Sequence, residues 1–191
     1  MLAFALFQKN SYLYYTISES GRWFFLLISM VLTIIAPLIS VGYLVYSKQV
    51  TSIYLDQRKE RIIPMTIALA YTMGLYYMLL KMSMPPIILA IVAIGVIQVA
   101  ITLLITLFWK ISAHMIGIAG FGGAILAMSQ LLQPVPTWVI IALFVLAGVV
   151  GSARIKQDSH TLTQVIAGWV LGFGISYFTL MIMATGTAAS I

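Results

Sequence analysis

Five stretches of this chain contain no Asp, Glu, Lys or Arg, and each is long enough to cross a membrane. They are residues 23–47, 62–80, 82–109, 111–153 and 161–191. A helix needs about 20 apolar residues to span the hydrocarbon core of a bilayer. Only 7% of the residues are charged, against roughly 25% in soluble domains. The sequence therefore predicts an all-α integral membrane protein and excludes an ordinary soluble enzyme, a disordered chain and a basic nucleic-acid-binding surface.

The fourth stretch is too long for one helix. Gln133-Pro134-Val135-Pro136 divides it, because two prolines close together end a helix. Ser83-Met84-Pro85-Pro86 separates the second helix from the third in the same way. The apolar runs lack the period-2 alternation of a membrane β-barrel. Six transmembrane helices are therefore predicted, at about residues 23–47, 62–80, 85–109, 112–132, 136–153 and 161–185.

Residues 23–191 are thus expected to form one six-helix membrane domain, and residues 1–22 a short N-terminal segment. The apolar start of this segment is too short to span a bilayer, and Tyr12, Tyr14 and Tyr15 are typical of the headgroup region. We expect an interfacial segment there.

The charged side chains gather at one end of the predicted bundle. With six spans, alternate connections share a membrane side, so residues 48–61, 110–111 and 152–160 meet at what is here called the basic end. Seven of the ten Lys and Arg residues fall there, and both histidines, His114 and His160, lie at the helix ends that adjoin these connections. The positive-inside rule is the simpler explanation of the seven-to-three bias, but it does not account for the histidines. Four of these seven residues are candidate phosphate ligands. Without them each end of the bundle has three Lys or Arg residues, so the sequence does not assign the basic end to either side of the membrane.

Three segments of the basic end carry groups that suit phosphate chemistry. They hold Arg58, Lys59 and Arg61, then Ser112 and His114, then Arg154, His160 and Gln164. Arginine binds phosphate oxygens in a bidentate manner, and a Ser-capped helix start offers free amides to an anion. One histidine can attack phosphorus while a second protonates the leaving oxygen. His160 and Gln164 are four residues apart, on one face of the last helix.

The same segments resemble the type 2 phosphatidic acid phosphatase superfamily, six-helix membrane enzymes with the motifs K-x6-R-P, P-S-G-H and S-R-x5-H-x3-D. Ser112-Ala113-His114 is similar to the second motif, and Arg154-x5-His160 has the spacing of the third. The likeness covers roughly residues 55–185. It implies that His160 forms a phosphohistidine, that His114 is the general acid, and that no metal or other cofactor is used. The implied phosphate ligands are Arg154 and Ser112, joined by Arg58, Lys59 and Arg61 in a compressed first motif that ends at Pro64.

Three positions depart from the family's pattern. Ile111 and Ala113 replace its proline and glycine, and Gln164 replaces its final aspartate. That aspartate holds the nucleophilic histidine and stabilises its positive charge, whereas a glutamine carbonyl supplies the hydrogen bond alone. In serine proteases the analogous Asp→Asn change costs about 10⁴ in rate. Asp158 is an alternative partner for His160 if the loop bends.

The glycines of the fourth and sixth helices form a further pattern. Gly117, Gly120, Gly122 and Gly123 lie in one helix and Gly168-x3-Gly172 in the other, which predicts close contact between the two helices. A narrow cleft for a lipid tail between them is the functional alternative.

The charged cluster together with this resemblance implies a metal-independent phosphatase or phosphotransferase that acts on a membrane lipid phosphate or diphosphate, in a bacterial cytoplasmic (inner) membrane. Its partners are the bilayer and the lipid, with no nucleic acid and no particular oligomeric state predicted. Cys is absent, and two histidines and four acids leave little material for a metal site. One alternative is a non-catalytic lipid-phosphate binder of the same fold, favoured by Gln164. The other is an unrelated small transporter subunit, although no span interior carries the acid or base that ion-coupled carriers usually require.

Overall fold

The structure is a computed structural model and describes residues 2–7, 12–53, 55, 57–131 and 134–188. This part of the chain is helical throughout its regular structure. Its elements in order are α1 Leu2–Phe7, α2 Tyr12–Thr16, α3 Glu19–Met30, the π-helical turn η1 Val31–Ile35, α4 Ala36–Tyr46, the 3₁₀ turn η2 Lys59–Arg61, α5 Ile62–Lys81, α6 Pro86–Phe108, α7 Ala113–Leu131, α8 Thr137–Lys156 and α9 Leu162–Ala188.

Six helices in the described part are long and apolar enough to cross a membrane, the first being α3, η1 and α4 joined as Glu19–Tyr46. The prediction of an all-α six-helix membrane bundle is therefore confirmed. The first span begins at Glu19 rather than at residue 23, because Ser18 caps it by accepting a hydrogen bond from the Gly21 N–H at 3.2 Å. The π-helical turn precedes Pro37, which has no N–H for the regular helical ladder.

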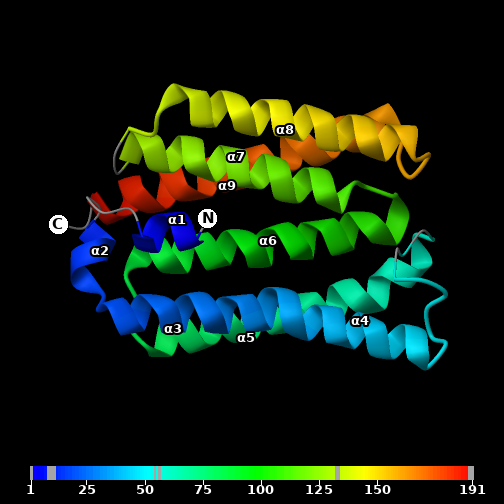
Figure 1. Cartoon of the computed structure of the whole chain (residues 1–191), viewed down its shortest axis with the longest axis horizontal. Coiled ribbons are helices and arrows are strands. Elements are labelled where there is room, and N and C mark those ends of the chain that lie inside the picture. Colours follow the sequence, from blue (N-terminus) through cyan, green and yellow to red (C-terminus); the bar gives the residue numbers. More distant parts are fainter. Residues whose placement is uncertain (1, 8–11, 54, 56, 132–133, 189–191) are drawn as a thin grey trace.

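The spans lie side by side, and the connections α4–α5, α6–α7 and α8–α9 meet at the right-hand end of Figure 1. This is the basic end. The turns α5–α6 and α7–α8 and the short helices α1 and α2 lie at the other end. The alternation of sides expected from six spans thus holds, and residues far apart in sequence come together at one end of the bundle.

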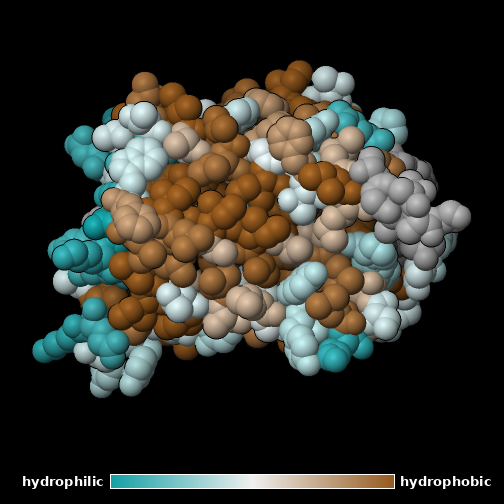
Figure 2. Space-filling model, turned by 180° about the vertical axis from the view of Figure 1, so that it is seen from behind, coloured by the Kyte–Doolittle hydropathy of each residue, from teal (hydrophilic) through white to brown (hydrophobic). Residues whose placement is uncertain are grey.

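The outward surface of the bundle is apolar. Leu38, Ile39 and Val145 are among many large hydrophobic side chains that remain more than half exposed, and Figure 2 shows a broad hydrophobic band with hydrophilic residues toward the ends. An exposed apolar belt on this scale requires a lipid environment. The protein is therefore an integral membrane protein.

α7 and α9 form the closest helix pair, as the glycine pattern predicts. A Cβ added at Gly172 would lie 2.2 Å from the Ile116 carbonyl oxygen, and one at Gly123 would lie 2.5 Å from the Phe173 carbonyl oxygen. The backbones at these positions touch, so the alternative of a lipid cleft between the paired glycines is wrong there.

The short helix α1 packs onto the bundle at the end opposite the basic end. Ala5 and Leu6 are fully buried in the same apolar cluster as Ile88 and Leu180. Arg22 of α3 holds α2 and the residues after it in place by donating to the carbonyl oxygens of Tyr14 and Ile17. These contacts do not test whether residues 1–22 lie at the membrane interface, so that placement stays a prediction.

Candidate functional site: two histidines and three cations at the basic end

His160 lies in the turn between α8 and α9. The backbone N–H groups of Ser159 and His160 donate to the Arg154 carbonyl oxygen at 3.2 and 3.3 Å, and Asp158 takes a left-handed conformation with φ of 51° to close the turn. The last turn of α8 therefore fixes the position of His160 relative to Arg154.

A capping box at the start of α9 orients the His160 ring. Thr161 is the N-cap residue, and its hydroxyl oxygen accepts from the Gln164 N–H at 3.4 Å, while Gln164 Oε1 accepts from the Thr161 N–H at 3.3 Å. The same oxygen lies 2.9 Å from His160 Nδ1. Because an amide oxygen only accepts, Nδ1 carries the ring proton and Nε2 keeps its lone pair.

His160 is buried, and its free nitrogen is enclosed. The residue is 5% exposed, and its Nε2 has no hydrogen-bond partner in the described part of the chain. Burial lowers the pKa of His160 from 6.5 to about 4; the hydrogen bond that its Nδ1–H donates to Gln164 opposes this, and the charges of Arg61, Lys110 and Arg154 add to it. The ring is therefore neutral near pH 7, and its buried Nε2 carries no proton.

His114 and Ser112 occupy the start of α7. The His114 side chain is exposed in the first turn, and Arg61 and Arg154, which act on His160, lie close to it as well. Ser112 is fully buried, and its hydroxyl has no hydrogen-bond partner among the described residues. Its carbonyl oxygen is held against Gly168 of α9, where an added Cβ would lie at 2.8 Å.

Arg154 is half-buried at the end of α8. One terminal nitrogen donates to Gln157 Oε1 at 3.2 Å, while its buried Nε has no partner within the described ranges. Arg154 Nε, Ser112 Oγ and His160 Nε2 are thus three buried polar atoms left unsatisfied, from three predicted site residues. Buried polar atoms in native structures usually have a protein or water partner, and outside the site Arg22 Nε and Ser29 Oγ are also without one among the described residues.

The three cations of the compressed first motif have different positions. Arg61 is 6% exposed, donates from Nε to the Leu55 carbonyl oxygen at 2.7 Å, and is close to both histidines. Arg58 instead donates to the carbonyl oxygens of Thr106 and Leu107 at the end of α6, where a cation is favourable. Lys59 is exposed in η2. The structure thus brings Arg61 into the cluster and turns Arg58 toward α6.

Lys110 is a member of the cluster that the sequence reasoning did not select. Its charge acts on His160 although fifty residues separate them in the sequence. The available signal was its position two residues before Ser112, in the connection that leads into α7.

The two acids of this end that the structure describes, Asp158 and Glu60, do not contact the histidines. Asp158 is exposed, and the partner of His160 Nδ1 is Gln164 rather than Asp158. Glu60 binds the backbone and hydroxyl of Thr51. No group of three or more His, Cys, Asp or Glu residues in the described ranges is placed to hold a metal ion.

The cluster combines a neutral buried histidine, a second exposed histidine, a buried hydroxyl and the cations Arg61, Lys110 and Arg154. Such a set attracts an anion and can attack it. No protein-family model, curated protein or solved structure matches the chain.

Proposed function

We propose that this protein is a metal-independent phosphatase or phosphotransferase acting on a membrane lipid phosphate or diphosphate, as a divergent member of the type 2 phosphatidic acid phosphatase superfamily in a bacterial cytoplasmic membrane. The observation that carries the proposal is the state of His160. Gln164 holds its Nδ1 at 2.9 Å, its Nε2 has no partner among the described residues, and Arg61, Lys110 and Arg154 act on it.

The reaction has two steps. His160 Nε2 attacks phosphorus and forms the N–P bond, while the bond from phosphorus to the lipid oxygen breaks. His114, which the charge of the bound phosphate helps to protonate, gives its proton to that oxygen. A water molecule then attacks the phosphohistidine and passes its proton to His114, and inorganic phosphate leaves with His160 neutral again. With a diphosphate the first leaving group is the lipid monophosphate. An alcohol in place of water makes the second step a transfer.

The surrounding groups have separate tasks in this scheme. Arg154, Arg61 and Lys110 neutralise the charge on the phosphoryl oxygens as it develops, and the Ser112 hydroxyl adds a donor. Gln164 is a positioning residue, because it acts on the ring nitrogen that does not react. Lys59 and Arg58 lie farther out, as an exposed cation and a cap of α6.

The location of the cluster supports a lipid as the substrate. It lies where four spans begin or end, and a span such as α7, Ala113–Leu131, is about 28 Å long, close to the hydrocarbon thickness of a bilayer. The cluster is therefore expected at the depth of lipid headgroups, where a lipid phosphate lies.

The test is phosphate release by the purified protein in detergent with chelator present. The panel is phosphatidate, phosphatidylglycerophosphate and a prenyl diphosphate, and His160→Asn is assayed beside the intact chain. We expect release that survives the chelator and is abolished by His160→Asn at unchanged thermal stability near pH 7. Release that persists in His160→Asn contradicts the proposal.

Gln164 favours one second candidate, a lipid-phosphate-binding protein of the same fold without turnover. A neutral amide gives the histidine no charge to stabilise its cationic form, which slows the first step. That candidate predicts saturable binding of phosphatidate that depends on Arg154, with no phosphate released from any lipid of the panel.

A further inference from the structure

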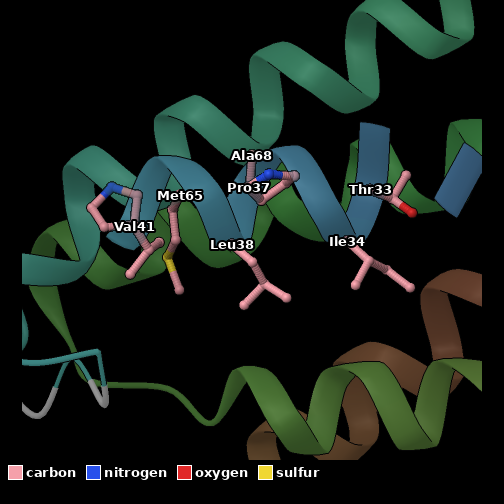
Figure 3. Close-up of a pocket in the computed structure, with 8 residues that line it drawn as sticks. Thr33, Ile34, Pro37, Leu38, Val41, Met65 and Ala68 are labelled. Carbon is pink, nitrogen blue, oxygen red and sulfur yellow. The ribbon is translucent and has the colours of Figure 1, made fainter. Parts of the chain in front are cut away.

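A groove open toward the bilayer runs along the first span beside α5. It has a volume of about 370 Å³ and lies between the stretch from Thr33 to Val41 and the first turns of α5. Figure 3 shows Ile34, Leu38 and Met65 pointing from these helices toward the same space. Ile34 and Leu38 are 50% and 66% exposed, so the wall of the groove is both apolar and accessible from the lipid side.

This groove adjoins a second hollow that reaches into the bundle. The second hollow measures about 230 Å³, lies between α5, α6 and α7, and shares Met65 and Ala68 with the first. The two together, here called the tail groove, extend from the outer surface of the first span to α7.

The inner part of the tail groove is lined by residues close in sequence to the histidine site. Ala113, which lies between Ser112 and His114, and Gly117, three residues after His114, both line it. On α5, Met65 lies one helical turn after Arg61, so the two residues share a helix face. A molecule in the groove therefore has one end beside the cationic cluster.

Gly117 differs from the glycines that seal α7 against α9. An added Cβ at Gly117 meets no described atom within 4 Å, whereas Cβ atoms at Gly120 and Gly172 would come within 2.2 Å of a neighbour. Helix packing therefore does not require a glycine at position 117. Its missing side chain instead leaves the groove open three residues after His114.

We propose that the tail groove binds a hydrocarbon chain of the lipid whose phosphate binds at His160, an inference that rests on the proposed function for its phosphate end. The occupant follows from the two ends of the groove, one apolar and open to lipid, the other cationic. A chain gains little free energy by leaving a bilayer for an equally apolar groove. The groove therefore acts by positioning, holding phosphorus in line with Nε2.

A hollow between α8 and α9 is the competing location. It measures about 300 Å³ and is lined by Met115, Gly151 and Val165, and also by Ser152, Ile155 and Leu162, which are close in sequence to Arg154 and His160. Met115 is buried and His114 exposed, so this hollow faces a different side of α7 from the one that carries His114 and Gly117.

The kinetic test compares two glycine-to-leucine variants. Gly117→Leu fills the tail groove, and Gly74→Leu is the matched control on the exposed face of α5, where an added Cβ also meets no described atom within 4 Å. The readout is the ratio of kcat/KM for long-chain phosphatidate to that for a water-soluble phosphate monoester. We expect roughly a 10- to 100-fold fall of this ratio in Gly117→Leu and none in Gly74→Leu. An unchanged ratio in Gly117→Leu overturns the groove.

A binding test separates failure of the groove from failure of the enzyme. A phosphonate analogue of phosphatidate with a photoreactive acyl chain is incorporated into phosphatidylcholine vesicles with the intact protein, and a phosphatidylcholine with the same chain is the control probe. We expect the phosphonate to label 33–41 and 65–68 at least several-fold more than the control does, with competition by phosphatidate and loss in Gly117→Leu. Preferential labelling of 152–155 and 162–166 overturns the groove even if phosphate is released. Groove labelling without any phosphate release upholds the groove and contradicts the enzyme.

Discussion

Replacing Gln164 with glutamate changes one charge at the ring nitrogen of His160 that does not react. The two side chains have the same shape, so the oxygen that accepts from Nδ1 at 2.9 Å and from the Thr161 N–H at 3.3 Å keeps its place. Gln164→Glu therefore tests the charge separately from the hydrogen bond. Gln164→Leu is the complementary variant, because it removes the hydrogen-bond acceptor and adds no charge.

The magnitude follows from the pKa of His160. Burial and three cations lower that pKa from 6.5 to about 4. An opposite charge at hydrogen-bond distance raises a pKa by about 1–3 units, which returns the pKa of His160 to between about 5 and 7. Each unit corresponds to about 1.4 kcal/mol, so the cationic phosphohistidine is stabilised by roughly 1.4–4 kcal/mol. If its formation limits turnover, kcat rises roughly 10- to 1,000-fold.

The assay is the pH profile of lipid phosphate release, combined with NMR of ¹⁵N-labelled histidine, because the chain has two histidines to resolve. At pH values above the new pKa of His160, we expect Gln164→Glu to have a higher kcat than the intact protein. We also expect the acid limb of its pH profile to move to higher pH, because a protonated Nε2 cannot attack. Gln164→Leu should lower kcat. An unchanged rate and profile in both variants would refute the positioning role of Gln164.

Three further predictions concern stability and affinity. Because folding lowers the pKa of His160, the unfolded chain binds a proton there at a higher pH than the folded chain does. The free energy of unfolding should therefore fall by up to about 3 kcal/mol as the pH drops from 6.5 toward 4. Melting curves in detergent measure this, and the same dependence of melting temperature on pH in the intact protein and in His160→Asn contradicts it. Arg58→Gln should lower the free energy of unfolding by about 1.5–3 kcal/mol, because the end of α6 loses its hydrogen-bond donor. Arg154→Gln should mainly weaken the binding of lipid phosphate. Equal losses of affinity in the two variants would contradict a role for Arg154, and not Arg58, in that binding. Gly172→Ala should cost about 1–3 kcal/mol, since its Cβ meets the Ile116 carbonyl oxygen at 2.2 Å, and an unchanged melting temperature contradicts that contact.

The spans were predictable because a charge inside the bilayer is costly, so charged residues mark the helix ends. Five of the six predicted spans agree with the structure to within a few residues, including α6, Pro86–Phe108, and α7, Ala113–Leu131. The sequence predicts too late a start for the first span, because Glu19 and Arg22 carry charges. The hydrogen bond that Ser18 accepts from the Gly21 N–H and the burial of Arg22 against the Tyr14 ring explain why the helix includes them.

The local part of the site was predictable, and the long-range part was not. The spacing of His160 and Gln164 places them on one helix face, and the 2.9 Å contact follows. Thr161-x-x-Gln164 has the sequence of a capping box and predicts the orientation of that amide. Sequence spacing does not indicate to which carbonyl groups a long arginine side chain donates. Whether Arg58 or Arg61 joins the cluster therefore depends on how α5 packs against α6. The tail groove is likewise a property of three packed helices.

The most direct test of the account is capture of the covalent intermediate. The intact protein is mixed with phosphatidate in detergent with chelator, quenched in base, in which phosphohistidine is stable, and analysed by peptide mass spectrometry. The account predicts a phosphoryl group on the peptide that carries His160, and none on the His114 peptide or in the His160→Asn variant. Phosphate release without phosphorylation of His160 would contradict it.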